Sequence, residues 1–287
     1  NIKPYWSNDY VDNRYLDNLV KKIKNSGVGK DFDCIIGMSG GLDSSYLVYL
    51  AKEVFGLSPL VFHVDAGWNS EIAVNNIEAL VKGLNVELFT EVIDWEEMKD
   101  LQLSYLKSGV PHIDSPQDHA FFATMYKFAS KYNIKHILTG SNISTECIRN
   151  PIEWMYYQSD STQLIDIYKK HGSKNHLKNF PITSVLWHKF WLPYIRGIKV
   201  FSPLDYVQYS KKDAMKLLKE KYNWKPYKQK HFESRFTKFY ESFWLPKRFG
   251  FDVRLVQFSS LILTNQMTRE EALENLLSPP YSKEFIS

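Results

Sequence analysis

Cysteine is scarce in this chain, which holds only Cys34 and Cys147 among its 287 residues. No CxxC pair occurs, so neither a zinc ribbon nor a framework of disulfides can be formed within this chain. Cys34 lies in an apolar run and is predicted to be a buried, small hydrophobic side chain. Cys147 has no patterned histidine partner, so neither thiol is predicted to act as a catalytic nucleophile.

Long apolar runs and a strong charge of one sign are missing as well. No stretch reaches the roughly 18 apolar residues that a membrane-spanning helix needs, and no signal peptide is visible, so we expect a cytoplasmic protein without a membrane span. The formal net charge is only +4. Nucleic-acid binders usually carry a stronger and more clustered surplus of positive charge, so an anionic small molecule is at least as good an expectation.

Strand-like and helix-like segments alternate over the first half of the chain. Short apolar runs predict buried strands at 33–38, 59–65, 86–93 and 136–139. Apolar residues recur at helical spacing over 10–26, 44–55, 72–84, 95–107 and 118–132. This alternation predicts an α/β fold in which a parallel sheet is built with right-handed crossovers.

The alternation fades after about residue 175, and residues 206–287 are predicted to be mainly helical. We therefore expect three parts. They are an N-terminal helical segment (1–30), an α/β domain (31–205) and a helical C-terminal lobe for substrate or partner (206–287).

A glycine turn follows the first predicted strand, in the segment 39–45 with the sequence SGGLDSS. Gly40 and Gly41 would let an anion approach backbone N–H groups without an intervening Cβ. The N-terminus of the helix that follows would add about half a positive charge. Hydroxyl groups that can donate to phosphate oxygens are present at Ser39, Ser44 and Ser45.

The carboxylate of Asp43 would repel a bare phosphate, so its position in this turn implies a cation between the two. Mg²⁺ held by one carboxylate plus phosphate oxygens is the usual arrangement. The segment 39–45 therefore predicts a cradle for pyrophosphate and Mg²⁺, with Asp43 as the metal ligand. The alternative is a Gly-Ser turn that only caps a helix.

The same segment carries a resemblance to a known superfamily. It is neither a GxxxxGK[ST] loop nor a GxGxxG turn. It resembles SGGxDS, the signature of the N-type ATP pyrophosphatases or PP-loop enzymes, with a complete match at Ser39, Gly40, Gly41, Asp43 and Ser44. The resemblance implies that ATP is split between its α and β phosphates, that AMP passes to a substrate oxygen, and that a nitrogen nucleophile then displaces AMP. The enzyme would contribute mainly positioning and charge stabilisation.

Other strand ends are predicted to complete the nucleotide site, because parallel strands present their carboxyl ends, where ligands bind, at one edge of the sheet. In the wider superfamily the second strand meets the adenosine, which makes Val64 and Asp65 candidates. The alternative for Asp65 is a helix N-cap. After the fourth strand, Gly140, Asn142 and Glu146 are predicted to line the adenosine or metal side, against the alternative of a plain strand-to-helix turn.

Two further segments supply candidates on the substrate side. Asp118 opens a predicted helix and is expected to reach the metal or the substrate, with a helix cap and a hydrogen-bonded surface histidine at 119 as the alternative. Residues 230–252 interleave basic and aromatic side chains, which predicts an amphipathic helix. Such a surface can bind a nucleotide-sugar, unless its aromatics are core and its charges are solvated. Its candidates are His231, Glu233, Arg235 and Lys238.

Five segments together indicate one branch of this superfamily. They are SGGLDSSYL, HVDAGWNSE, PQDHAFFA, TGSNISTE and HFESRFTKFY, and the likeness covers about residues 30–278. The chain resembles the bacterial sugar N-acetyl amidotransferases of surface-polysaccharide, lipopolysaccharide O-antigen and flagellin-glycan pathways, including the pseudaminic-acid type. Some relatives carry a Cys-rich, zinc-binding module ahead of the first helix, and this sequence shows none, which leaves its metal content open.

This second resemblance implies a reaction and its components. With ATP and Mg²⁺, the acetamido oxygen of an N-acetyl sugar, free or nucleotide-linked, would be adenylated and replaced by ammonia. The products would be an acetamidino sugar, AMP and pyrophosphate. Ammonia would come from a separate, histidine-biosynthesis-like glutaminase working with a cyclase-like subunit. The catalytic candidates are Asp43, Ser44, Asp118, Arg235 and Lys238.

Two other function classes compete with this interpretation. The basic, aromatic C-terminal segment also suits a tRNA-modifying PP-loop enzyme of the thiolation or lysidine type. The modest net charge and the lack of paired cysteines argue against it. A non-enzymatic, nucleotide-binding regulatory subunit is the third class, and the intact SGGxDS segment argues against that.

Overall fold

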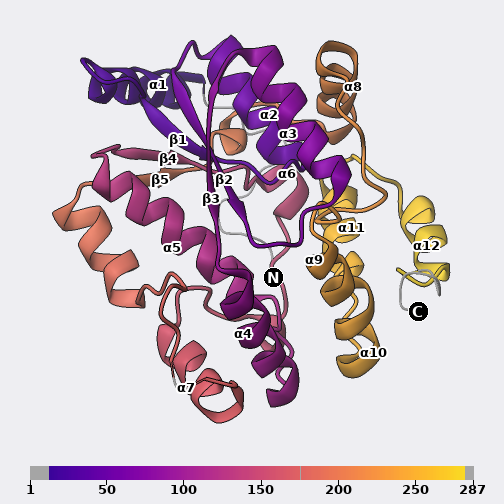
Figure 1. Ribbon diagram of the computed structural model, residues 1–287. Coiled ribbons are helices and arrows are strands. Elements are labelled where there is room, and N and C mark those ends of the chain that lie inside the picture. The colour runs from indigo at the N-terminus through magenta and orange to yellow at the C-terminus, as the bar shows by residue number, and fades with distance from the viewer. Residues whose placement is uncertain (1–12, 175, 282–287) are drawn as a thin grey trace.

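A computed structural model describes residues 13–174 and 176–281 of the chain. One sheet of five parallel strands forms its centre, in the order β3-β2-β1-β4-β5 (Figure 1). The strands are β1 Cys34–Gly37, β2 Pro59–Asp65, β3 Glu87–Val92, β4 His136–Leu138 and β5 Lys199–Phe201. The predicted α/β fold with a parallel sheet is therefore confirmed.

Helices lie between the strands in the sequence, and further helices come after the last strand. In chain order they are α1 Asn13–Gly27, α2 Leu42–Tyr49, η1 Leu50–Val54, α3 Glu71–Leu84, α4 Trp95–Ser108, α5 Ser115–Lys131, α6 Ile143–Glu146, η2 Ile152–Trp154, α7 Ser161–His171, η3 Trp187–Ile195, η4 Pro203–Tyr206, α8 Lys211–Tyr222, α9 Arg235–Phe239, η5 Tyr240–Trp244, α10 Leu245–Phe249, α11 Arg254–Leu263 and α12 Arg269–Leu277. Five of them lie where helices were predicted. Residues 10–12 of the first predicted helix lie outside the described residues.

The fifth strand was not predicted, and its packing explains why. Strand β5 has only three residues, at the edge of the sheet, and Lys199 and Val200 are exposed there. A strand this short and this exposed has neither the apolar run nor the alternation by which strands are found in a sequence. It is placed by pairing with β4, where Ile137 lies opposite Val200.

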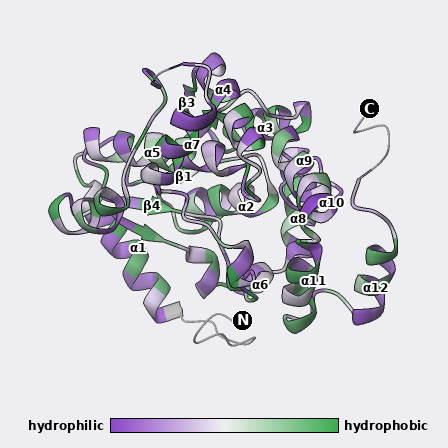
Figure 2. Ribbon diagram, turned by 90° about the horizontal axis from the view of Figure 1, so that it is seen from below, coloured by the Kyte–Doolittle hydropathy of each residue, from purple (hydrophilic) through white to green (hydrophobic). Residues whose placement is uncertain are grey.

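Two hydrophobic cores cover the two faces of the sheet. Because successive strand residues point to opposite faces, Ile35 joins the core beneath α4, α5 and α7, whereas Ile36 joins the core beneath α1, α2, α3 and α8. Cys34 is fully buried in the second core, as predicted. Figure 2 shows helices that mix hydrophobic and hydrophilic residues along their turns, as this two-sided packing requires. Among the described helices, none combines the length and the apolar character that crossing a bilayer demands.

The C-terminal helices reach the carboxyl edge of the sheet through short pairings. The backbone N–H of Ser70 donates to Glu233 (2.9 Å), and that of Arg235 donates to Trp68 (2.8 Å), around an antiparallel bridge between Asn69 and Ser234. Helix α8 packs on α2 and α3, and α11 packs on α6. These contacts bring residues 211–261 over the strand ends. The division at 205/206 stays a prediction.

A buried carboxylate holds α7 against α4. Asp100 accepts hydrogen bonds from the hydroxyl of Tyr168 (2.7 Å) and from the backbone N–H of Ser173 (3.1 Å). Burial raises the pKa of Asp100, but these hydrogen bonds outweigh burial and the pKa lies below its ordinary value. The charged form of Asp100 is therefore the form that the fold stabilises.

We predict that Asp100→Asn lowers the free energy of unfolding by about 2 kcal/mol at neutral pH, since hydrogen bonds to a charged acceptor contribute about 1.5–3 kcal/mol. The contribution of a group with a lowered pKa is present above its unfolded-state pKa and is lost as the pH falls through its folded-state pKa. The difference between wild type and variant should therefore shrink between about pH 7 and about pH 3 in urea unfolding. An equal difference at both values would contradict this role.

Candidate active site

The glycine turn after β1 is fixed by hydrogen bonds to one of its own carbonyl groups, that of Gly40. Gly40 has a φ of 81° and a Cβ there would lie 2.8 Å from the carbonyl oxygen of Ala73, so only glycine fits. Its carbonyl accepts hydrogen bonds from Asn76 Nδ2 (3.4 Å), Trp224 Nε1 (3.3 Å) and Tyr227 Oη (3.2 Å). Three donors thus hold the negative end of this peptide, which leaves the N–H side of the turn for an anion.

The helix that follows starts without a side-chain cap. Gly41 is the N-cap of α2 and no side chain accepts from the first turn. The first N–H groups of a helix have no intrahelical partner, so an uncapped start attracts an anion. The hydroxyl of Ser39 lies 3.4 Å from that of Ser44 and accepts from the N–H of Gly41 (3.3 Å). This arrangement matches a phosphate cradle.

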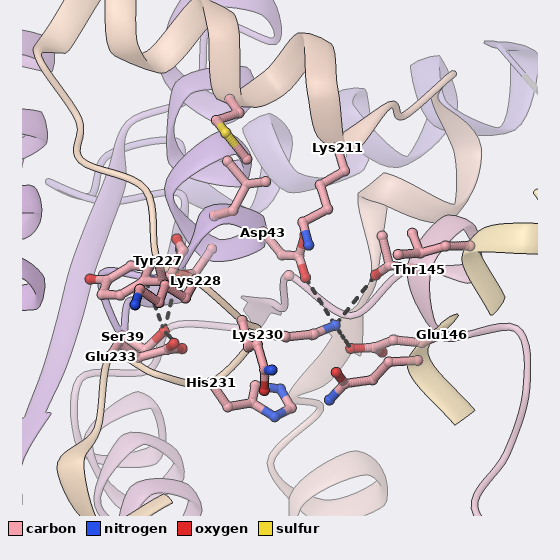
Figure 3. Close-up of a pocket in the computed structure, with 18 of the residues that line it drawn as sticks. Ser39, Asp43, Thr145, Glu146, Lys211, Tyr227, Lys228, Lys230, His231 and Glu233 are labelled. Atoms are coloured by element: carbon pink, nitrogen blue, oxygen red, sulfur yellow. Dashed lines mark hydrogen bonds and ion pairs between the residues drawn. The ribbon is translucent and has the colours of Figure 1, made fainter. Parts of the chain in front are cut away.

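A cavity of about 330 Å³ opens between this turn and the C-terminal helices, and we call it the loop cavity. Figure 3 shows lysines of α8 and of the segment before α9 pointing into it. Residues of the turn and of the β4 end that line it are Ser39, Gly41, Leu42, Asp43, Ser44, Gly140, Thr145 and Glu146. The opposite wall includes Lys211, Trp224, Tyr227, Lys228, Lys230, His231 and Glu233.

One ammonium group joins two carboxylates in the loop cavity. Lys230 Nζ lies 3.1 Å from Asp43 Oδ2 and 2.5 Å from Glu146 Oε1 (Figure 3). Tyr209 donates to the other oxygen of Asp43, and Ser141 donates to Glu146 (2.9 Å). Burial lowers the pKa of Lys230, but the two carboxylates outweigh burial and raise it. Asp43 and Glu146 therefore share one position for a cation.

A second cavity of about 570 Å³ lies along the strand ends, and we call it the sheet-edge cavity. Its apolar lining includes Phe62, Val64, Phe121, Phe122, Met125 and Leu138. Ser39, Gly140, Glu146, His231 and Glu233 line both cavities. An apolar slot that meets an anion cradle has the form of a nucleotide site, with base and ribose in the slot and phosphates in the cradle.

Two side chains from the segment before α9 stand between the cavities. Glu233 accepts a hydrogen bond from Ser39 Oγ (3.0 Å). His231 lies 2.7 Å, through Nδ1, from Glu241 Oε1. Burial lowers the pKa of His231, but the charge of Glu241 and the hydrogen bond to it outweigh burial and raise the pKa to about 9. His231 therefore carries a positive charge at neutral pH.

The structure brings ten of the sequence-predicted residues to the two cavities. They are Ser39, Gly41, Asp43, Ser44, Val64, Asp118, Gly140, Glu146, His231 and Glu233. Gly40 holds the turn from behind through its carbonyl. The contribution of Gly140 is close packing, because a Cβ there would lie 2.8 Å from the backbone nitrogen of Ser44. The functional roles of these residues stay predictions.

Five other predicted residues do not line either cavity. Ser45 is fully buried behind the turn, and Asp65 accepts from the N–H of Gly67 (2.8 Å) in the loop after β2. Asn142 is the N-cap of α6 and accepts from the N–H of Thr145 (2.8 Å), as in the plain-turn alternative. Arg235 is exposed and lines neither cavity, and Lys238 lies over the ring of Phe232 (5.3 Å).

The capping alternatives for two acidic residues are wrong. The N-cap of α3 is Ser70 rather than Asp65. The N-cap of α5 is Asp114, and Asp118 instead accepts from the hydroxyl of Tyr156 (2.5 Å) in the sheet-edge cavity. His119 is hydrogen-bonded at both ring nitrogens, as that alternative held, but it is buried rather than on the surface.

Sequence reasoning missed the lysines of the loop cavity. Lys211, Lys228 and Lys230 come from the C-terminal lobe and carry no motif. Lys230 had a weak signal, since it opens the basic, aromatic segment that was already singled out. Tyr209, the partner of Asp43, had none. In the described part of the chain, no three His, Cys, Asp or Glu side chains gather as a metal cluster.

Comparisons with known proteins bear on both ends of the chain. Residues 233–287 match the family described as LPS biosynthesis protein WbpG-like, C-terminal domain. The NH(3)-dependent NAD(+) synthetase of Mycoplasma genitalium is 29% identical over 134 residues, which cover 44% of this chain and 50% of that protein. The chain thus spans half the length of the curated relative that it matches.

Three solved structures are similar to this chain, each at low sequence identity. The NMN synthetase of Francisella tularensis is 16% identical with a TM-score of 0.34, covering 79% of this chain and 100% of that one. The U34-tRNA thiolase NcsA of Methanococcus maripaludis, with its [4Fe-4S] cluster, is 16% identical with a TM-score of 0.39, covering 88% and 80%. The NH3-dependent NAD synthetase of Campylobacter jejuni is 12% identical with a TM-score of 0.37, covering 92% and 97%.

The complete SGGxDS turn between a parallel strand and a helix, together with the sequence similarity to an NAD synthetase, supports the resemblance to the PP-loop ATP pyrophosphatase superfamily. The match at residues 233–287 supports a resemblance of the C-terminal part to WbpG-like proteins of lipopolysaccharide biosynthesis. These likenesses bear out the resemblance to PP-loop and lipopolysaccharide biosynthesis proteins, whereas the sugar amidotransferase reaction stays a prediction.

We predict that Gly140→Ala weakens ATP binding and lowers the free energy of unfolding by about 1–3 kcal/mol, the usual effect of overpacking. The added Cβ would meet the backbone of Asp43 and Ser44, which cannot rotate away. Gly37→Ala is the comparison, because its Cβ would meet only the flexible end of Met125 (3.2 Å). Calorimetry and thermal unfolding check both variants, and equal losses in the two would contradict the packing role.

We predict that the His231 imidazole keeps its proton up to a pH of about 9, and that Glu241→Gln lowers this pKa towards or below the ordinary value of about 6.5. The variant removes the opposing charge and leaves the burial that disfavours imidazolium. NMR titration of the histidine rings measures both values, and His231→Gln identifies the signal. Titration of the wild-type ring near its ordinary value would refute the pairing.

Proposed function

We propose that this protein is an ATP-dependent, AMP-forming amidotransferase of surface-glycan biosynthesis. It adenylates the acetamido oxygen of an N-acetyl sugar and replaces that oxygen with ammonia, which gives an acetamidino sugar, AMP and pyrophosphate. The observation that carries the proposal is the loop cavity, where the SGGxDS turn faces a lysine-bearing wall from the C-terminal lobe. The WbpG-like match over that lobe supports a substrate of lipopolysaccharide biosynthesis.

The phosphates of ATP would lie in the loop cavity. The N–H groups after Gly41 and the hydroxyls of Ser39 and Ser44 would donate to the β and γ phosphates. Lys211 and Lys228 line the same cavity and would balance the charge of the departing pyrophosphate. Adenosine would lie in the sheet-edge cavity against Val64 and Met125, which puts the α phosphate near Ser39 and Gly140, where the cavities meet.

Asp43 and Glu146 fit a magnesium ion. They are hard oxygen donors that already converge on one cationic atom, the Nζ of Lys230. Mg²⁺ in phosphate sites is usually held by one or two carboxylates plus phosphate oxygens and water. The ion would supply charge stabilisation for pyrophosphate as a leaving group. When ATP enters, Lys230 would move from the two carboxylates to the phosphates.

The sugar would approach from the side of His231 and Glu233, which line both cavities. The imidazolium of His231 can donate to an anionic or polar group of the substrate, and Glu233 can accept from a sugar hydroxyl. Arg235 and Lys238 remain candidates only for a more distant part of a nucleotide-sugar, because neither lines a cavity.

Ammonia would come from another subunit or from solution. Burial raises the pKa of Cys34, and both Cys34 and Cys147 are buried, so neither thiol suits glutamine hydrolysis. A glutaminase of the histidine-biosynthesis-like kind, with a cyclase-like subunit, is the partner set we propose. A cytoplasmic location is part of the same proposal.

The test is a product assay with ATP, Mg²⁺, ammonium chloride and a panel of N-acetyl sugars, free and nucleotide-linked. We expect AMP, pyrophosphate and a sugar that is about one mass unit lighter, because O is replaced by NH. Formation of ADP would overturn the pyrophosphatase chemistry. AMP release that needs tRNA would favour the tRNA-modifying alternative.

In that assay, Asp43→Asn should lower the rate of AMP formation by about 100-fold, the usual effect of removing one group that stabilises transition-state charge. The matched control is Asp17→Asn, an exposed position on α1. Thermal unfolding of both variants separates a loss of function from a loss of fold. Unchanged activity in Asp43→Asn would instead support a regulatory nucleotide-binding subunit.

A further inference from the structure

One end of the sheet-edge cavity is strongly acidic. Asp114 and Asp118 at the start of α5, and Glu241 on η5, line it and influence one another electrostatically. Glu146 and Glu233 also line this cavity, whereas no Lys or Arg is among its lining residues. The loop cavity differs in the sign of its charge, because three lysines line it.

The charges at this end do not balance. His231 is the cation that faces Asp114, Asp118 and Glu241, and its imidazolium is already paired with Glu241. The phenols of Tyr156 and Tyr240, which also face the two aspartates, are neutral. Two carboxylates therefore remain without a cationic partner among the groups that face them.

Asp114 has an oxygen with no donor. The residue is 4% exposed, and its Oδ2 accepts from the hydroxyl of Thr237 (2.9 Å). Its Oδ1 is buried and has no hydrogen-bond partner within the described residues. A buried carboxylate oxygen without a donor is costly, and two close carboxylates repel each other. Burial, followed by the charge of Asp118, raises the pKa of Asp114 well above its usual range, and burial also raises the pKa of Asp118.

The chemistry of this end selects a small cation with N–H donors. No three His, Cys, Asp or Glu in the described chain are arranged to hold a metal ion there. An unpartnered carboxylate oxygen can accept an N–H, and Tyr156 and Tyr240, whose aromatic rings can attract a cation, line the same cavity. Ammonium meets these requirements and is the prevailing form of ammonia at neutral pH.

We infer that Asp114 and Asp118 form the ammonium site of this enzyme, and that one of them takes the proton that ammonium must lose. The inference rests on the proposed function. Ammonium gives one proton to a carboxylate, which becomes a carboxylic acid, and leaves as neutral ammonia. The lone pair of ammonia forms a C–N bond to the carbon of the adenylated acetamido group. The C–O bond between that carbon and AMP then breaks, and its electron pair stays with AMP. The cavity is continuous from Asp114 to Ser39 and Gly140, where the α phosphate would lie.

Asp114→Asn and Asp118→Asn, made separately in the full chain, test the site. We expect each to raise the KM for ammonium by about tenfold or more, as the loss of a charge-assisted hydrogen bond would. Exchange of labelled pyrophosphate into ATP, measured with the sugar and without ammonium, reports adenylation by itself and so separates a loss of ammonium binding from a loss of that earlier step. The matched control is Asp166→Asn on the exposed face of α7.

The outcomes separate this inference from the proposed function. A raised KM for the sugar with an unchanged KM for ammonium would overturn the inference and assign the cluster to sugar hydroxyls. Loss of exchange in folded variants, with no change in the KM for ammonium, would also overturn it. If the wild-type chain shows no exchange and forms no AMP, the proposed function fails.

A structural measurement tests the cation site without any activity. Thallium(I) matches ammonium in charge and closely in size, and it is located by its anomalous scattering. We expect an anomalous peak between Asp114 and Asp118 in wild-type crystals soaked in thallium(I) acetate, and its loss in crystals of either variant. A wild-type map without that peak would refute the ammonium site, whether or not the variants fold.

Discussion

The site depends on one peptide group, the carbonyl of Gly40. In a left-handed conformation it points its oxygen at Asn76, Trp224 and Tyr227, and so turns the N–H side of the loop towards the cavity. An anion cradle needs this orientation, because a single carbonyl aimed at a phosphate would oppose the N–H dipoles around it. Since two of the donors belong to the C-terminal lobe, the lobe shapes the loop as well as covering it.

The two cavities divide the charge of the proposed reaction. Lysines line the cavity proposed for the phosphates, carboxylates line the end proposed for the nitrogen donor, and His231 and Glu233 line both cavities. Adenylation needs positive charge near pyrophosphate, whereas the nucleophile needs a proton acceptor, and a single cavity of uniform charge would serve one step at the expense of the other. Two backbone hydrogen bonds, from Ser70 to Glu233 and from Arg235 to Trp68, hold the segment between the two cavities in place.

Local patterns predicted the first four strands, the loop and its five motif residues, because each depends on neighbours in sequence. Strand β5 could not be found, since only its pairing with β4 defines it. Ser45 illustrates a different limit: a hydroxyl in the motif suggests a ligand contact, but the helical turn directs this side chain into the interior. Lys230 and Tyr209 reach Asp43 through tertiary packing alone. Arg235 was expected to bind substrate, but as the first residue of α9 it is exposed.

The hydrogen bond from Ser39 to Glu233 joins residues 194 positions apart in the sequence. Contacts over such separations form late in folding, because the loop-closure entropy must be overcome before they contribute. During synthesis the strand-and-loop half of the molecule therefore emerges with its nucleotide cradle unfinished. In the proposed reaction, ATP splitting would therefore have to wait until the C-terminal residues that complete the loop cavity have docked.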